Sequence, residues 1–428
     1  MMMNEKMQKI GKFIRENCAA DDFTLHINNS QTSATRFAQN AITHNMGGEN
    51  TNLYLEVTFG TKTGAVSGNI FDEKSLQQLI KTAESIASLN QPDPEFVASE
   101  GAHKLPETTK TSHETISLSS EKMVDNIAKC VENAKHKDAN ISGISEKEIS
   151  KNYMLTKNGF EGFDEEAVFS HSMTMKKDGK ETKVSKSVND FNNFSMENQL
   201  NQLNLQFDSL DNPVSMEKGR MPVILRPAAV LNWLHYLAWG FNLRSADDGL
   251  TPFTGKLGKQ VFGEKFNLYS RQNQAKISAP SFFSNGLPVR DIDWIKNGVI
   301  QTMSSNRFYA NKKGILPAQF YNFIVDGENI SEKEMMKKVK RGVIVNSLWY
   351  IRSTDQKVGE QTGLTRDGVL YFEDGEIVKS VKNFRWNEIL HDATKRIIAL
   401  GESVHQSYYA KIPTMLIDDF NFVDVTTF

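Results

Sequence analysis

The pattern of apolar and polar positions predicts strands followed by a helix in the first part of the chain. Apolar side chains alternate with polar ones at 23–27 and again at 53–59, which is the period of two of half-buried strands. Apolar residues over 76–87 then recur at the spacing of one helix face, and Asp72 stands where an N-cap is expected. The stretch 1–95 is therefore predicted to be an N-terminal α/β region.

A second region, predicted at 113–210, combines both patterns. Ser119 precedes an apolar helical stripe that contains Cys130, which we expect to be buried and inert. Asp178-Gly179 separates two strand-like stretches and is typical of a type I′ hairpin. We interpret this region as a central α+β unit.

The third region, predicted at 219–428, is rich in strands and tight turns. Pro227 follows a short apolar run and predicts the first turn of a helix that continues to about Phe241. Turns are expected at three pairs that favour positive φ: Asn297-Gly298, Asp367-Gly368 and Asp374-Gly375.

Two more helices are expected in this region. Ser331 and Glu334 form a capping box, with Gly342 as the expected end of that helix. Apolar spacing predicts another helix over 387–400, closed by Gly401. The chain as a whole is predicted to be a multi-domain α+β protein, with an N-terminal sheet-plus-helix region and a β-rich C-terminal domain that has a few helices.

Composition excludes several classes of protein. Lys and Arg number 50 against 52 Asp and Glu, so the chain has no positive excess with which to bind nucleic acid. Its two cysteines, Cys18 and Cys130, are too few for a disulfide framework or a multi-cysteine zinc site. No apolar run reaches the roughly 18 residues of a membrane-spanning helix, and the N-terminus has no signal-peptide core. We expect a cytoplasmic protein whose partners are neither membranes nor nucleic acids.

His235 is the most interesting candidate for chemistry, because it lies inside an apolar helix. A zinc-peptidase helix needs two imidazoles directed at one metal and a carboxylate beside the first. The next residue is Tyr236, and five residues after His235 stands Gly240, so neither requirement is met. The residues alone favour a histidine of the core or of an interface over a metal ligand.

Nearly the whole chain resembles the TldD/PmbA family. The N-terminal resemblance lies in Arg36–Asn45 and Glu49–Thr51. The remaining motifs follow in the family's order, at 221–225, the His235 helix, 253–258, 363–369, 373–376, 383–388 and 413–422. The resemblance implies intracellular peptide maturation and protein turnover by a zinc protease.

The resemblance also implies a degenerate metal site. One branch of the family carries His-Glu-x-x-x-His on the central helix and a late cysteine ligand, whereas the PmbA-like branch lacks them and is the companion subunit. The first histidine falls on His235, but Tyr236 and Gly240 replace the glutamate and the second histidine, and no cysteine follows Cys130. The chain thus resembles the companion branch, with zinc expected only in a ligand-bearing partner.

We therefore expect a metallopeptidase-related protein that is a non-catalytic protease subunit, with a TldD-like partner or a second copy of itself and a peptide or unfolded-protein substrate. One alternative is an active peptidase with an atypical metal site, such as His235 with His391 or His405. Another is a non-proteolytic, peptide-binding homodimer. A candidate peptide-pairing strand, which the same pattern also allows to be core, comprises Val343, Val345, Ser347, Trp349 and Ile351.

Overall fold

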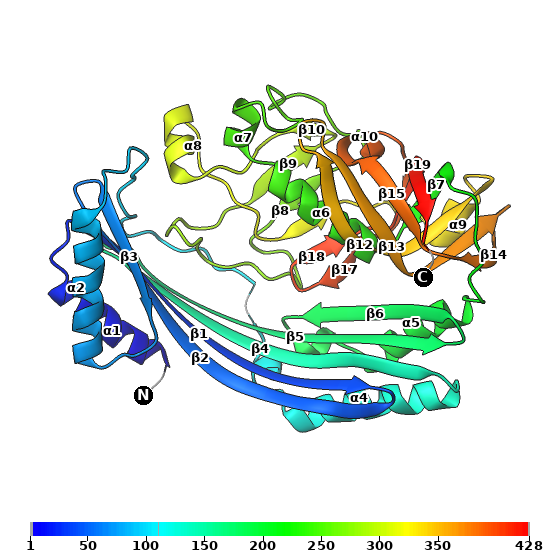
Figure 1. The fold of residues 1–428 in the computed structure, drawn as a ribbon, viewed down its shortest axis with the longest axis horizontal. Helices are drawn as coiled ribbons and strands as arrows, with labels where there is room; N and C mark the ends of the chain where they lie inside the picture. The colour runs from blue at the N-terminus through cyan, green and yellow to red at the C-terminus, as the bar shows by residue number, and fades with distance from the viewer. Residues whose placement is uncertain (1–2, 110, 427–428) are drawn as a thin grey trace.

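A long, curved antiparallel sheet forms the base of the molecule in the computed structural model, which describes residues 3–109 and 111–426 (Figure 1). Its strand order is β3-β2-β1-β4-β5-β6. The strands are β1 (Asp22–Ala38), β2 (Ala41–Phe59), β3 (Lys62–Gly68), β4 (Asn140–Thr156), β5 (Glu161–Lys177) and β6 (Lys180–Val188). Because β1 pairs with β4, this one sheet joins the regions predicted at 1–95 and 113–210.

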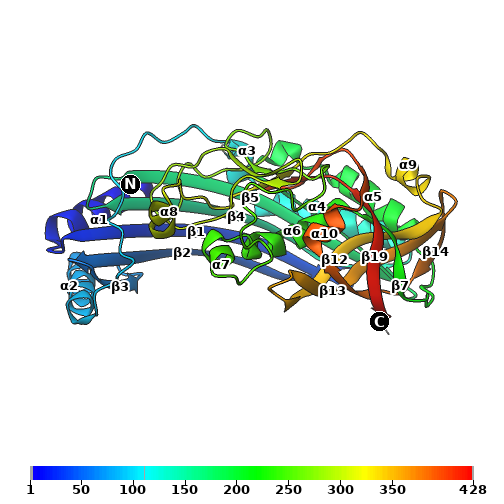
Figure 2. The same cartoon turned by 90° about the horizontal axis from the view of Figure 1, so that it is seen from above.

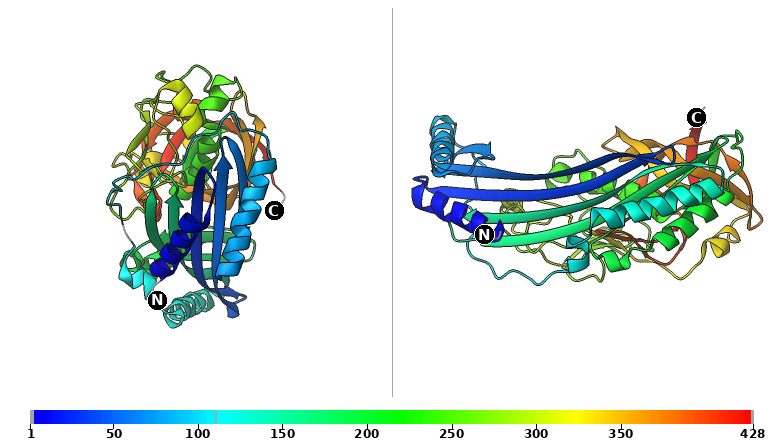
Figure 3. Two further views of the ribbon diagram at one scale, coloured as in Figure 1. Left: turned by 90° about the vertical axis from the view of Figure 1, so that its left-hand side faces the viewer. Right: turned by 90° about the horizontal axis from the view of Figure 1, so that it is seen from below.

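Helices cover the two ends of this sheet. At one end lie α1 (Met3–Asn17) and α2 (Glu73–Leu89), and at the other lie α4 (Ser120–His136) and α5 (Met196–Asp208), as the view from below shows (Figure 3). The predicted N-caps Asp72 and Ser119 both accept a backbone N–H of the first helical turn. The short α3 (His113–Ile116) and the 3₁₀ turn Phe191–Asn193 complete the N-terminal half.

The C-terminal half contains two further sheets. One has the order β10-β9-β8-β11-β18-β17. Its strands are β8 (Leu268–Ser270), β9 (Ile292–Lys296), β10 (Val299–Ile300), β11 (Phe323–Val325), β17 (Val404–Ser407) and β18 (Ala410–Ile412). The other runs β12-β7-β19-β15-β13-β14, and it closes on itself because β12 also pairs with β13.

The closed sheet consists of β7 (Gly219–Leu225), β12 (Arg341–Asp355), β13 (Glu360–Glu373), β14 (Glu376–Val381), β15 (Phe384–Ile389) and β19 (Met415–Val425), and β16 (Ile397–Leu400) pairs with β19. The helices of this half are α6 (Pro227–Gly240), α7 (Leu243–Asp247), α8 (Arg307–Lys313), α9 (Glu332–Met336) and α10 (Leu390–Thr394). This half lies over one face of the long sheet, toward one end of its strands (Figure 2). The predicted multi-domain α+β class is confirmed.

Three local predictions in the C-terminal half are wrong. The helix expected over 387–400 is instead the end of β15, the five-residue α10 and the strand β16. Gly342 does not end α9, which stops at Met336, because Gly342 already pairs within β12. Asp367-Gly368 has positive φ but lies inside β13, where the pairing with β12 is irregular, so it forms a bulge.

Cys130 is buried, as the apolar stripe of its helix predicted, and it lies beside His171. Its Sγ lies 3.6 Å from His171 Nε2, and Ser145 Oγ lies 2.6 Å from His171 Nδ1. Burial raises the pKa of the Cys130 thiol to about 12, so the thiolate that reacts with electrophiles is scarce at neutral pH. Burial also lowers the pKa of His171 to about 4, which keeps the imidazole neutral.

The stability of the fold should therefore fall with pH below about 6.5. An unfolded His171 takes up a proton near pH 6.5 whereas the folded one does so only near 4, so His171 removes up to roughly 3 kcal/mol as the pH falls through that window. Urea unfolding between pH 7 and 4 measures this slope, and His171→Asn should reduce it. His136→Asn, at an exposed position of α4, is the control and should leave the slope unchanged. An equal slope in wild type and His171→Asn would contradict the assignment.

Candidate functional site

The central helix α6 packs against the C-terminal core by its apolar face. Val230, Leu234, Leu237 and Phe241, which recur at the spacing of one helix face, are all buried. Pro227 occupies the first helical position, where its missing N–H costs no hydrogen bond. The opposite face is open, because Trp239 is 79% exposed.

His235 is half-buried on α6 and is held by aromatic neighbours. Its Nε2 lies 3.2 Å from the hydroxyl of Tyr409, and its ring packs edge-on against Phe323 and stacks on Tyr409. Burial lowers the pKa of His235, so the neutral imidazole is favoured. The Nε2 nitrogen of His235 is therefore already in contact with the hydroxyl of Tyr409, and the ring lies among aromatic side chains.

The residues around His235 do not fit a catalytic zinc ion. Tyr236 is partly buried against the core and its ring packs beside Trp239, while Gly240 offers no side chain. Zinc in a peptidase needs about three protein ligands and a base that activates water. Within 3–109 and 111–426, no group of three or more His, Cys, Asp and Glu side chains is placed to hold a metal.

The two other candidate histidines have their own neighbours. His391 lies in the first turn of α10 and packs edge-on against Phe253 and Phe262. His405 lies in β17, and its Nε2 is 3.1 Å from the carbonyl oxygen of Ala275. In the described part of the chain, neither joins His235 in a set of metal ligands.

The candidate peptide-pairing strand lies within β12. Val343 and Val345 are buried and pair on both sides, with β7 and with β13, so this half of the strand has no free edge. Beyond Val345, β12 pairs with β13 and with no other described strand, and Trp349 is 47% exposed. Ser347 and Ile351 belong to this second half, where Ser347 Oγ donates to Asp367 Oδ2 at 2.5 Å. Only the outer half of the predicted set therefore has a free edge among the described strands.

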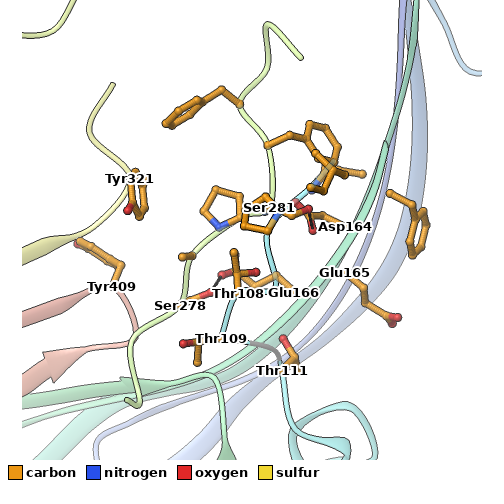
Figure 4. Close-up of a pocket in the computed structure, with 18 of the residues that line it drawn as sticks. Thr108, Thr109, Thr111, Asp164, Glu165, Glu166, Ser278, Ser281, Tyr321 and Tyr409 are labelled. Carbon is orange, nitrogen blue, oxygen red and sulfur yellow. Dashed lines mark hydrogen bonds between the residues drawn. The ribbon is translucent and has the colours of Figure 1, made fainter. Parts of the chain in front are cut away.

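A large groove lies between the long sheet and the C-terminal half. It has a volume of about 1030 Å³. Its walls are the linker residues 105–109 and 111, the start of β5 at 163–166, the loop 278–284 and the aromatic pairs 320–321 and 408–409 (Figure 4). We call it the central groove.

Serine–carboxylate contacts connect the two walls of the central groove. The backbone N–H of Ser281 donates to Asp164 Oδ2 at 2.8 Å, and its hydroxyl donates to Asp164 Oδ1 at 2.5 Å. Ser278 Oγ donates to Glu166, and burial raises the pKa of that carboxyl. Figure 4 shows both serines directed from the loop toward β5. These contacts fix the loop 278–284 against the sheet and so set the shape of the groove.

Tyr409 connects the central groove with α6. The residue lines the groove, and its hydroxyl contacts His235 Nε2 on α6. The remnant of the expected metal site therefore lies directly behind the aromatic end of the groove. Sequence reasoning singled out His235 but missed the groove, since the groove is assembled from five segments that are far apart in the sequence. Ser278-Ala-Pro-Ser-Phe-Phe-Ser284, which is rich in serine and aromatic residues, is the one local signal.

Comparison with known proteins agrees with this fold. Residues 218–424 match the PmbA/TldA metallopeptidase C-terminal domain. The chain is similar in structure to TldE from Thermococcus kodakarensis, with a TM-score of 0.88 and 17% identity over 98% of this chain and 100% of that one. A proposed modulator of DNA gyrase from Thermotoga maritima is similar with a TM-score of 0.85 and 17% sequence identity, over 99% of this chain and 100% of that one. One from Bacteroides thetaiotaomicron gives 0.87 and 14% over 99% of each chain.

Two further findings complete the comparison. No curated protein matches the chain in sequence. Over the described residues, the structure has no helix of the length and apolarity that crossing a membrane requires. The matched domain places residues 218–424 in the PmbA/TldA metallopeptidase family, and the chain as a whole shares the fold of these solved structures, in agreement with the TldD/PmbA resemblance seen in the sequence.

Proposed function

We propose that this chain is the non-catalytic companion subunit of a zinc protease assembly, acting in proteolysis or peptide maturation. In this proposal it binds an extended peptide in the central groove and carries no zinc of its own, while a TldD-like partner supplies the metal. One observation carries the proposal: a well-formed groove ends at Tyr409, whose hydroxyl engages His235 where the family's catalytic branch places its first zinc ligand.

The groove suits a peptide better than a small metabolite. Its volume of about 1030 Å³ is at the upper end of the roughly 300–1,000 Å³ typical of small-molecule sites. Pro280, Phe282 and Phe283 give one wall an apolar surface, while threonines of the linker and the start of β5 give the other wall hydrogen-bonding groups. Such a mixed surface can accept both the side chains and the main chain of an extended segment.

A free strand edge supports the expected assembly. Residues 41–50 of β2 are all exposed. Among the described strands they pair with β1 on one side, and their other side is free because β3 pairs only with 53–59. Two apolar side chains of this edge, Ile42 and Met46, are 43% and 46% exposed. Because a long unpaired edge invites pairing with another chain, we propose this edge as the contact with a partner subunit or with a second copy.

The proposal is tested by the metal content and activity of the pure protein. Elemental analysis should find far less than one zinc per chain, and the chain alone should leave an unfolded casein uncleaved. Adding a relative that carries His-Glu-x-x-x-His should produce cleavage above that of the relative alone. One tightly held zinc per chain, with cleavage that a chelator abolishes, would instead establish an active peptidase. Binding of casein without any effect on such a relative would favour a peptide-binding homodimer.

Filling the central groove should prevent peptide binding. Thr108 is half-buried on the linker and lines the groove, so Thr108→Trp should occupy space that the peptide needs. We expect binding of fluorescein-labelled unfolded casein to weaken by at least about tenfold, which corresponds to roughly 1.4 kcal/mol. Lys104→Trp, at an exposed position of the same linker, is the control and should bind as wild type does. Unchanged affinity in Thr108→Trp would remove the groove from the proposal.

A further inference from the structure

A second, smaller pocket lies on the other side of the 407–409 segment from the central groove. It has a volume of about 330 Å³ and lies where β6 of the long sheet meets β17 and β18. Its basic lining comprises Lys186 of β6, Lys276 of the loop between β8 and β9, Lys411 of β18 and His405 of β17. We call it the lysine pocket.

The basic side chains of the lysine pocket have no acidic partners close by. In the described parts of the chain, no carboxylate oxygen lies within 4 Å of the amino group of Lys186, Lys276 or Lys411. Lys186 Nζ donates instead to the carbonyl oxygen of His405. Glu402 is the acidic residue that lines the pocket, and it is exposed.

These like charges act on one another. Burial, together with the smaller effect of the charge on Lys276, lowers the pKa of Lys186 to about 8. The pKa of His405 is also lowered, by burial most of all; the hydrogen bond to Ala275 opposes this, and Lys186, Lys411 and Lys276 add to it. The lowered pKa of Lys186 and of His405 means that burial and the neighbouring positive charges disfavour the protonated form, and that no nearby negative charge of the described residues offsets them. An anion in the pocket would supply that charge and would relieve the repulsion.

We propose that the lysine pocket binds a single carboxylate or phosphate group. Three lysines line a cavity of the size of a small-ligand site, and ammonium groups bind carboxylate and phosphate oxygens through charge-assisted hydrogen bonds. The pocket joins the two halves of the molecule, so an anion there would connect β6 of the long sheet with β17 and β18. The proposal does not depend on peptide binding in the central groove.

The two pockets are neighbours through one segment of backbone. The N–H of Ser278, at the edge of the central groove, donates to the carbonyl oxygen of Tyr408 at 2.6 Å. The N–H of Tyr408 lies 3.3 Å from Ser187 Oγ, beside the lysine pocket. Occupation of the lysine pocket therefore holds the segment that carries Tyr408 and Tyr409 into the central groove.

Calorimetric titration of the full chain tests the proposal with two probes. Inorganic phosphate represents a phosphate ligand, and N-acetylglycine represents the terminal carboxylate of a peptide. We expect saturable binding of at least one probe at one site per chain, and at least about tenfold weaker binding in Lys186→Met. Lys183→Met removes an exposed lysine of the same strand and should bind as wild type does. Lys276→Met, at an exposed pocket position, replaces Lys186→Met if the latter fails to fold.

Proton uptake gives a second readout, which simple charge screening would not produce. At pH 8 about half of Lys186 is neutral, so binding of the fully ionised N-acetylglycine should take up a fraction of a proton. Heats measured in Tris and in HEPES reveal this uptake, and Lys186→Met should abolish it. Preference for phosphate or for N-acetylglycine identifies the source of the ligand. The proposal is overturned if neither probe saturates below about 10 mM, or if Lys186→Met and Lys276→Met bind both as wild type does.

Discussion

Leu237→Asp is expected to unfold the C-terminal half of the molecule at ambient temperature. Leu237 is 4% exposed and lies on the buried face of α6, so the change removes an apolar side chain and buries a carboxylate without a partner. The lost packing alone costs about 2–5 kcal/mol, and the buried charge adds several more. Leu234→Asp should behave in the same way. Urea unfolding followed by tryptophan fluorescence measures both.

Two further substitutions on α6 test whether burial of position 237 causes the loss of unfolding free energy. His235→Ala loses a 3.2 Å contact with Tyr409 and should cost only about 1 kcal/mol. Trp239→Asp places the same carboxylate at a position that is 79% exposed and should cost under about 1 kcal/mol. If His235→Ala were the most damaging of the set, the histidine would hold the structure together and the packing assignment of α6 would be wrong.

Glu388→Ala should cost about 3 kcal/mol, the second large effect. Its side chain is 5% exposed, lies 2.8 Å from the guanidinium of Arg396 and 3.9 Å from that of Arg220, and accepts the backbone N–H of Asn421 at 3.3 Å. Removing one partner of a buried ion pair typically costs 3–5 kcal/mol, and here both arginines keep a second carboxylate, Asp419, at 3.5 Å from Arg220 and 3.8 Å from Arg396. Partial exposure of the arginines places the expectation at the low end of that range.

Asp424→Ala is the matched control for Glu388→Ala. Asp424 also belongs to an ion pair of the closed sheet, with Lys218 at 3.7 Å, but both side chains are more than half exposed. Solvent-exposed pairs of this kind contribute about 0–1 kcal/mol. Equal losses of unfolding free energy in Glu388→Ala and Asp424→Ala would show that burial of the Glu388 cluster is unimportant.

Local chemistry predicted much of the secondary structure. Asp72, Ser119 and Ser331 each cap the helix that the sequence assigned to them, because a cap depends on only three or four neighbouring residues. Asp178-Gly179 forms the predicted hairpin turn with both residues at positive φ, which its type I′ geometry requires.

Predictions failed where distant partners decide the structure. Apolar residues over 387–400 recur at helical spacing, yet Phe384–Ile389 pairs with β13 and β19, and Ile397–Leu400 pairs with β19. Strand partners at the far end of the chain thus override a local helical period. The central groove was beyond prediction for a related reason, since residues near 108, 165, 280 and 408 meet only when both halves have folded.

The sequence singled out one helix as the place of the degenerate metal site, but it did not predict the surroundings of that helix. The family resemblance placed His235, Tyr236 and Gly240 on one helix, and α6 carries all three. The partner of His235 is Tyr409, 174 residues away, and no spacing rule relates the two. Likewise, the lysines of the lysine pocket come from positions 186, 276 and 411, and each alone is an ordinary charged residue of the sequence.

The pairing of β1 with β4 has a consequence for the chain during its synthesis. β1 ends at Ala38 and β4 at Thr156, so the edge of β1 that pairs with β4 has no partner until about 120 more residues have left the ribosome. At ribosomal rates of about 5–20 residues per second, that wait is roughly 6–24 s. Throughout it the edge of β1 is unpaired, and β2 is unpaired over 41–50 even after β3 has paired with 53–59. We expect the nascent chain to be most prone to aggregation in this interval, when a holding chaperone would help it most.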